Sequence, residues 1–148
     1  MSRVVAVFVL VLGLAQSNSA TDHPCTASAA IQADEDVDHL SDWDHVYRSY
    51  QRFSQCDDGS VAEGYSDAIA KLLADKWDSF HRLVALSKGN RRFQRFVLQH
   101  INTTVSDDVL HRIARNTRSE CPQGAQGLCN LIASAVSRAE SDAAATSQ

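Results

Sequence analysis

Two carboxylates four residues apart are the groups in the sequence that could most directly perform hydrolysis. Glu63 could act as a general acid if it is desolvated beside Tyr65, and Asp67 could supply the second carboxylate that glycosidases use. A simpler interpretation is also open, because Ser60 and Glu63 have the spacing of a helix capping box and Asp67 falls on the solvent side of the same helix. We therefore expect no catalytic residues, with a cell-envelope hydrolase that uses Glu63 and Asp67 as the alternative.

Arginine residues recur on the polar faces of two predicted helices. One group lies opposite the apolar face of residues 90–101, and the other recurs every three residues opposite Val109 and Ile113. If the two helices are neighbours, six guanidinium groups share one surface, and their planar fork suits the carboxylates or phosphates of a partner. An ordinary solvated face is the other interpretation. The candidate binding residues are Arg91, Arg92, Arg95, Arg112, Arg115 and Arg118.

The acidic and histidine residues do not complete a metal-binding motif. Asp34, Asp36 and Asp38 have the spacing that begins a calcium-binding loop, but His39 and His45 stand where that loop needs Gly and Glu. The two histidines do not fall on one helical face, which argues against a zinc or copper site. We expect neither a metal nor another cofactor.

Four cysteines, Cys25, Cys56, Cys121 and Cys129, are expected to form two disulfides, and three pairings are open. No C-x-x-C pair occurs, which disfavours metal binding. A helix that starts at Pro122 would place Cys121 and Cys129 about 10–12 Å apart along its axis, beyond the ~7 Å limit for a bridge. The sequence therefore favours long-range pairings that involve Cys56 and Cys25.

The composition is that of one folded domain. The chain has 148 residues, of which 44% are hydrophobic, and a formal net charge of −4. These values exclude a long disordered chain and a strongly basic nucleic-acid binder. They also exclude a multidomain enzyme, since one domain of about 100–150 residues uses the whole chain. We expect no nucleic-acid partner.

The first twenty residues are typical of a secretory signal peptide. Arg3 precedes an apolar run over residues 4–15, and Asn18 and Ala20 are the small residues expected before a cleavage site. The run is shorter than the ~20 residues that span a bilayer, so we expect cleavage after Ala20 and no membrane-spanning segment afterwards. Loss of Arg3 takes the formal charge to −5, which gives no general affinity for anionic membranes. The predicted location is periplasmic or secreted.

Apolar residues repeat with helical periodicity from Ser41 onwards, as Trp43, Val46 and Tyr50 illustrate. No segment alternates as a strand would. The sequence predicts an all-α fold, a single compact domain of five or six helices reinforced by disulfides. The expected helices cover residues 41–56, 60–77, 79–87 and 90–101, and two more start at Thr104 and Pro122.

Three further segments complete the predicted organisation. Residues 21–40 are small, polar and acidic and are expected to form a flexible acidic arm. Residues 41–137 form the helical domain. Residues 138–148 are rich in Ala and Ser and are expected to be a disordered tail.

Several short motifs resemble a family of small exported helical proteins of Gram-negative bacteria whose activity is not characterised. The resemblance spans Tyr47 to Ile132 and implies a periplasmic helical domain without implying an activity. In overall architecture the chain is also similar to periplasmic immunity proteins that neutralise type VI secretion effectors. The motifs are Cys56-Asp57-Asp58-Gly59, Glu63-Gly64-Tyr65-Ser66-Asp67, Phe96-Val97-Leu98-Gln99-His100-Ile101, Cys121-Pro122 and Leu128-Cys129.

These observations predict a non-enzymatic periplasmic binding protein, an inhibitor or immunity-type protein that occludes a periplasmic or secreted protein partner. The hydrolase based on Glu63 and Asp67 is one alternative. A structural or stress-related periplasmic protein is the other.

Overall fold

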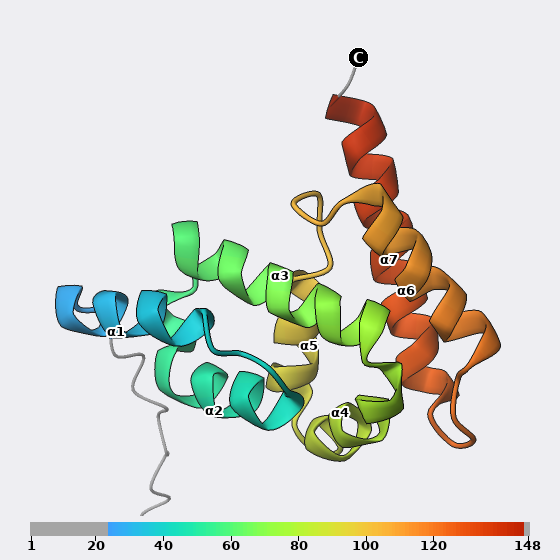
Figure 1. Ribbon diagram of the computed structural model, residues 1–148, viewed down its shortest axis with the longest axis horizontal. Helices are drawn as coiled ribbons and strands as arrows, with labels where there is room; N and C mark the ends of the chain where they lie inside the picture. The colour runs from blue at the N-terminus through green and yellow to red at the C-terminus, as the bar shows by residue number, and fades with distance from the viewer. Residues whose placement is uncertain (1–23, 147–148) are drawn as a thin grey trace, which may run out of the picture.

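Helical periodicity produces seven α-helices and two single-turn 3₁₀ helices over residues 24–146, the part of the chain that the computed structural model describes. No strand occurs in this part, so the predicted all-α class is confirmed, although seven helices exceed the predicted five or six. The predicted signal peptide, residues 1–20, lies outside the described residues. The helices are α1 (Ala27–Val37), α2 (Trp43–Phe53), η1 (Ser54–Cys56), α3 (Gly59–Asp75), η2 (Trp77–Ser79), α4 (Phe80–Ser87), α5 (Arg91–Gln99), α6 (Asp107–Ser119) and α7 (Gln126–Thr146) (Figure 1).

The central element is α3. It crosses the middle of the molecule, with α1 and α2 on one side and the paired helices α6 and α7 on the other (Figure 1). Tyr65, Ile69 and Leu73 are fully buried on successive turns of α3, which allows helices from both ends of the chain to pack against it. Among the described helices, none has the combination of length and apolar character that a membrane span requires.

An aromatic cluster joins α2, α3 and α5. Phe93 packs edge-on against Tyr47, with ring centroids 4.8 Å apart. Phe96 packs at 4.9 Å against both Tyr50 and Tyr65. Aromatic pairs in such geometries contribute about 0.5–1.5 kcal/mol beyond the area they bury. The apolar faces predicted for α2 and α5 therefore do point into the core.

The buried hydroxyl of Tyr65 should lower the free energy of unfolding at alkaline pH. It lies 2.7 Å from Ser49 Oγ, and burial raises the pKa of Tyr65 to about 12, opposed by the hydrogen bond with Ser49. The folded protein therefore keeps a proton that the unfolded chain releases near pH 10. The free energy of unfolding should fall by about 2–3 kcal/mol as the pH rises from 10 to 12. Urea unfolding at a series of pH values checks this. The Tyr65→Phe variant should lose less stability between pH 10 and 12 than the unmodified protein, and equal losses in the two proteins would contradict the prediction.

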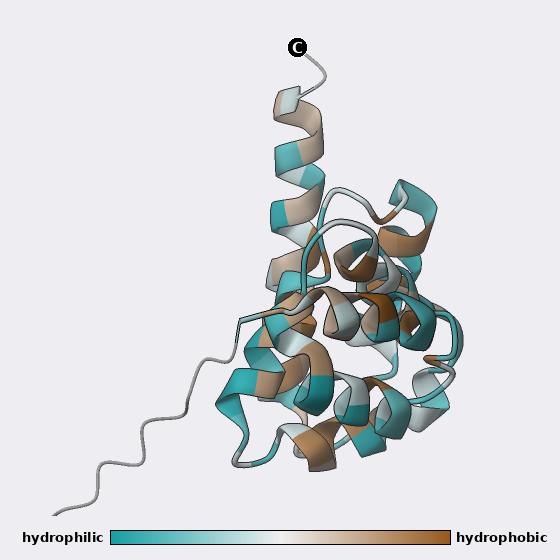
Figure 2. Ribbon diagram, turned by 90° about the vertical axis from the view of Figure 1, so that its left-hand side faces the viewer, coloured by the Kyte–Doolittle hydropathy of each residue, from teal (hydrophilic) through white to brown (hydrophobic). Residues whose placement is uncertain are grey.

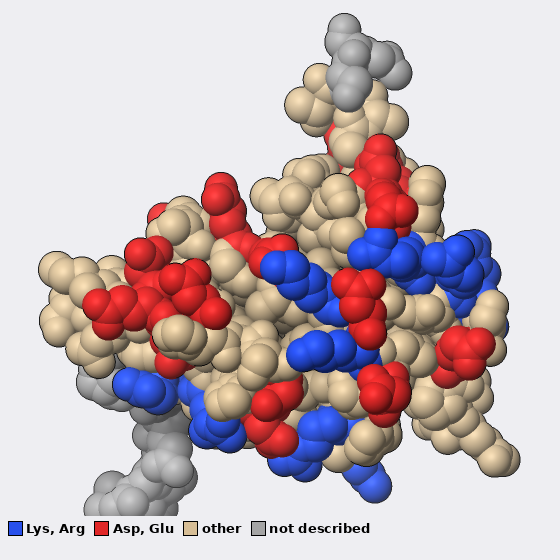
Figure 3. Space-filling model, in the orientation of Figure 1, with Lys and Arg blue, Asp and Glu red and all other residues tan. Residues whose placement is uncertain are grey.

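The prediction of a flexible arm over residues 21–40 is wrong for α1, which is an ordered helix. Thr26 Oγ1 caps it by accepting a hydrogen bond from the Ala29 N–H at 3.2 Å. Ala33 and Val37, one turn apart, are buried and packed with α3. The acidic residues of α1 face solvent and form a negative patch at the left of Figure 3. The acidic composition therefore describes only the outer face of this helix.

The disulfide pairing differs from the prediction, because excluding a Cys121–Cys129 bridge also excludes the Cys25–Cys56 bridge that accompanies it. The Cys25–Cys56 bridge is long-range, with a sequence separation of 31, but Cys121 pairs with Cys129 across a separation of 8. The predicted helix start is wrong, because α7 begins at Gln126 and not at Pro122. Residues 122–125 form a turn in which the Ala125 N–H donates to the Pro122 carbonyl. The turn folds the chain back, so the two Cα atoms are 6.2 Å apart.

The prediction of a disordered tail from residue 138 is also wrong, since α7 continues to Thr146. Ala139 is buried, and Glu140 lies 3.6 Å from His111 of α6, so the neighbouring helix supports α7 this far. The C-terminal turns of α7 project from the body of the molecule (Figure 2). The high helix propensity of alanine accounts for these last turns, and residues 147 and 148 lie outside the described part.

Candidate functional site

A groove between α3 and α6 is the best-formed cavity that carries the predicted site residues. Its volume is about 420 Å³, within the usual range of ligand sites. The loop that precedes α6 contributes to the lining of the groove. The lining residues are Glu63, Asp67, Ala70, Lys71 and Asp75 of α3, Thr104, Val105 and Ser106 of the loop, and Val109 and Arg112 of α6.

The spacing along α3 explains the charged wall of the groove. Four charged residues follow one another at intervals of four, from Glu63 to Asp75, and residues with this spacing lie on one side of a helix. The opposite helix is held in place by Asn116, whose Nδ2 donates to the carbonyls of Leu73 and Ala74 at 2.9 and 3.0 Å. These bonds tie α6 to the C-terminal part of α3 and so set the width of the groove.

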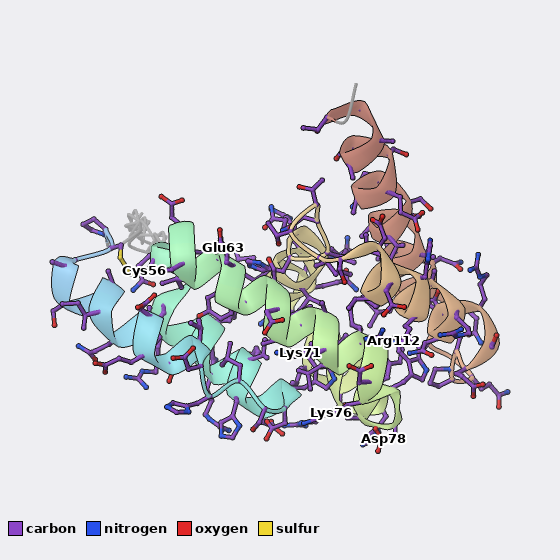
Figure 4. All side chains as sticks on the ribbon, turned by 45° about the horizontal axis from the view of Figure 1, so that its top comes forward. Cys56, Glu63, Lys71, Lys76, Asp78 and Arg112 are labelled. Carbon is purple, nitrogen blue, oxygen red and sulfur yellow. A yellow bond between two sulfur atoms is a disulfide. The ribbon has the colours of Figure 1, made fainter. Side chains whose placement is uncertain are left out.

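Ion pairs cross the groove and run along it. Lys71 Nζ lies 2.6 Å from Asp67 Oδ2 on α3, and Arg112 Nε reaches from α6 to Asp75 Oδ1 at 3.1 Å. Arg112 also pairs with Asp108 on its own helix. Figure 4 shows Arg112 beside the C-terminal half of α3, while Glu63 lies nearer its N-terminus. Acidic and basic side chains consequently alternate across this face of the molecule (Figure 3).

Glu63 and Asp67 line the same groove, but their surroundings are not those of a general acid. Both are exposed, and Asp67 is paired with Lys71, whereas a catalytic acid requires desolvation. The predicted capping box is wrong, because Asp58 Oδ1 caps α3 by accepting from the Gly59 N–H at 2.8 Å. Glu63 therefore makes no capping bond, and it has no ion-pair partner among residues 24–146.

The predicted arginine residues fall into separate groups. α5 packs on α4 and α7 and, through its aromatic residues, on α2 and α3, whereas α6 packs mainly on α3 and α7, so the two arginine-bearing helices are not principal packing partners. Arg112 lies in the α3–α6 groove, and Arg115 and Arg118 are exposed further along α6. Arg91 and Arg92 line a different hollow at the start of α5, where Arg95 is also exposed.

His100 falls on the apolar face of residues 90–101, a position that predicts burial, and it is 4% exposed; the polar network around it was not predicted. His100 Nδ1 lies 3.0 Å from Ser66 Oγ, and its Nε2 lies 3.2 Å from Asp57 Oδ2 without the alignment of a hydrogen bond. The order of groups is that of a Ser–His–Asp triad. However, Ser66 is 2% exposed and its hydroxyl donates to the Ala62 carbonyl, so no substrate can reach it. The network joins α3 to the end of α5 within the core.

The described residues contain no group of three or more His, Cys, Asp or Glu side chains arranged to hold a metal ion. His39, one of the two histidines considered above, is exposed. The other, His45, lies 3.0 Å from Asp42 at the start of α2, where Asp42 caps the helix. His39 is therefore exposed, and the ion pair of His45 is made with a residue three positions away in the chain.

Comparisons of the chain with protein-family models, with curated proteins and with solved structures found no match. The resemblance to small exported proteins therefore stays a prediction. Any function has to be inferred from the residues and the geometry described above.

Proposed function

We propose that this protein is a non-enzymatic binding protein, periplasmic or secreted, whose α3–α6 groove and adjoining face of α6 engage a protein partner. The observation that carries the proposal is the groove itself. It presents charges of both signs on its walls over an apolar floor that includes Ala70, Val105 and Val109. Such a surface suits a polypeptide segment that carries charges of both signs. An inhibitor or immunity-type protein would occlude a segment of this kind on its partner.

The existing ion pairs leave the groove available for a partner. The side chains of Lys71 and Asp67 are 66% and 64% exposed, and exposed pairs contribute at most about 1 kcal/mol. Exchange of such pairs for contacts with a partner therefore costs little. Arg115 and Arg118 have no ion-pair partner within the described chain and extend the basic surface along α6. Complementary charge of this kind chiefly provides specificity and fast association.

The disulfides support an exported location. Cys25–Cys56 and Cys121–Cys129 bridge all four cysteines. Disulfides persist in oxidising compartments and are rare in reducing ones. Together with the signal peptide predicted at residues 1–20, they favour the periplasm or the extracellular medium as the place where the partner is met.

Two other functions stay in competition. A cell-envelope hydrolase is favoured by one observation, that Glu63 and Asp67 line the same groove. Turnover of cell-envelope material by the purified protein, lost in Glu63→Gln, would establish it and overturn the binding proposal. A structural or stress-related role would show neither turnover nor a specific partner.

Site-specific cross-linking in the host cell tests the proposal directly. A photoreactive amino acid is placed at Ser106, on the rim of the groove, and in a second strain at Ser134, which is exposed on α7. We expect one dominant protein adduct from position 106 and none of the same mass from position 134. Adducts that do not depend on the position, or no adduct, would contradict a partner at the groove.

Charge reversal then tests how the captured partner is bound. Replacement of Arg112, Arg115 and Arg118 by Glu should raise the Kd for the purified partner by about tenfold or more, because complementary charges become repulsive. The matched control replaces Arg91, Arg92 and Arg95 by Glu, which changes the net charge equally but on α5. Calorimetric titration should show unchanged affinity in the control. Equal losses in both variants would point to overall charge and against the groove.

A further inference from the structure

A second hollow, distinct from the α3–α6 groove, lies beside the turn between α4 and α5. Its volume is about 830 Å³. The turn is tight because Gly89 adopts a φ of +80°, a conformation that favours glycine. Five residues from three helices meet around the hollow, together with Gly89 and Asn90 of the turn. They are Ser87 at the end of α4, Arg91, Arg92 and Gln94 of α5, and Leu131 of α7.

The start of α5 carries hydrogen-bond donors that have no acceptor. Asn90 Oδ1 accepts from the Phe93 N–H at 3.0 Å, but the N–H groups of Arg91 and Arg92 have no acceptor within residues 24–146. Their guanidinium groups are exposed and have no ion-pair partner in the same part of the chain. First-turn N–H groups also carry the positive end of the helix dipole. The hollow is thus electropositive in a protein whose net charge is −4.

Ser87 supplies a second, independent indication of a ligand. Ser87 is 7% exposed, and its Oγ has no hydrogen-bond partner among the described residues, although Ser87 lines the hollow. A buried hydroxyl without a partner is unfavourable, and native proteins rarely leave one. None of the described residues around the hollow is acidic, and a bound molecule that brings an acceptor into the hollow would satisfy the hydroxyl.

We propose that this hollow binds the phosphate group of a small phosphate ester. Arg91 and Arg92 hold the phosphate oxygens through their guanidinium groups and backbone N–H groups, and Ser87 donates a hydrogen bond to the same group. Leu131, which is 43% exposed, contacts the organic part of the ester. The site does not depend on the partner proposed for the α3–α6 groove.

Titration followed by amide NMR tests the site on the oxidised protein. The probes are inorganic phosphate and n-butyl phosphate, with chloride at equal ionic strength as the blank. We expect saturable shifts of the Arg91 and Arg92 amides with both phosphates and tighter binding of butyl phosphate. Leu131→Ser should remove the advantage of the butyl group. Absence of a saturable shift at the start of α5 would overturn the proposal.

Variants with matched charge identify the residues that bind. Arg91→Gln combined with Arg92→Gln should raise the Kd for butyl phosphate by about tenfold or more, and Ser87→Ala should raise it by a smaller factor. The control, Arg115→Gln combined with Arg118→Gln, removes the same charge from α6 and should leave the Kd unchanged. Equal weakening in the control would show that the attraction is only general, which would overturn the site.

The phosphate group could belong to a soluble ester or to a lipid headgroup, and vesicles separate these sources. Sedimentation with phosphatidic acid vesicles, compared with phosphatidylcholine vesicles, measures binding to a membrane-borne phosphate monoester. Butyl phosphate binding without sedimentation supports a soluble ligand, and binding of both supports a lipid headgroup. Sedimentation without binding of either soluble phosphate would contradict the proposed pocket.

Discussion

Loss of the Cys25–Cys56 disulfide should lower the free energy of unfolding by about 3.5 kcal/mol. The bridge closes a loop with a sequence separation of 31, and the entropy that a cross-link removes from the unfolded chain grows with loop length. The Cys121–Cys129 bridge closes a separation of only 8, and its removal should cost less, about 2.5 kcal/mol. Urea unfolding of the two double Cys→Ala variants compares them.

The effect of the Cys25–Cys56 bridge should also be local. It links the residue before the Thr26 cap to η1, so its loss releases the N-terminal end of α1. Hydrogen exchange of the α1 amides should therefore accelerate more than that of α6 amides in the Cys25→Ala, Cys56→Ala variant. An equal cost for both disulfides, or unchanged exchange in α1, would contradict the importance we assign to this bridge.

Gly64→Ala should destabilise the protein by about 1–3 kcal/mol through a clash between α1 and α3. A Cβ atom at position 64 would lie 2.6 Å from Val37 Cγ2 and 2.7 Å from Val37 Cβ, far inside the normal contact distance. Val37 belongs to the buried face of α1, so the methyl group would push that helix away from α3. Thermal or urea unfolding measures the loss.

A double-mutant cycle separates this clash from the general effect of alanine in a helix. Alanine has a higher intrinsic helix propensity than glycine, so propensity alone predicts a gain in stability for Gly64→Ala. Val37→Ala in the same chain removes the atoms that clash and should recover part of the loss. Gly127→Ala is a matched control in α7, because a Cβ atom there meets nothing within 4 Å. Stabilisation by Gly64→Ala would contradict the close packing of the two helices.

Both predictions concern α1, the helix that the sequence pattern did not reveal. Most of its apolar residues are alanines, and only Ala33 and Val37 are buried on it. Its order comes from partners far away in the chain. Cys56 holds its N-terminal end through the disulfide, and α3 packs closely against it because Gly64 has no side chain where Val37 approaches. Local composition, which is acidic and small, describes only its exposed side.

The sequence also determined the part of the candidate site that lies on α3, but not the part that α6 contributes. The placement of Glu63, Asp67 and Lys71 along one side of α3 follows from helical spacing. The groove exists only because α6 packs beside α3, held by the bonds of Asn116 to the end of α3. Similarly, the apolar face of α5 predicted that His100 is buried, whereas its neighbours Ser66 and Asp57 come from distant segments.

Local interactions determined most of this fold. Helical periodicity, the Asn90 cap and the left-handed Gly89 are set within a few residues, so the sequence by itself was sufficient for α2 to α6 and for the all-α class. Tertiary structure decided the order of α1 and the two cavities, because these features depend on contacts between residues far apart in the chain, whose free energy no local pattern contains. The turn at residues 122–125, which pairs Cys121 with Cys129, is local, but the helical pattern did not distinguish it from a first helical turn.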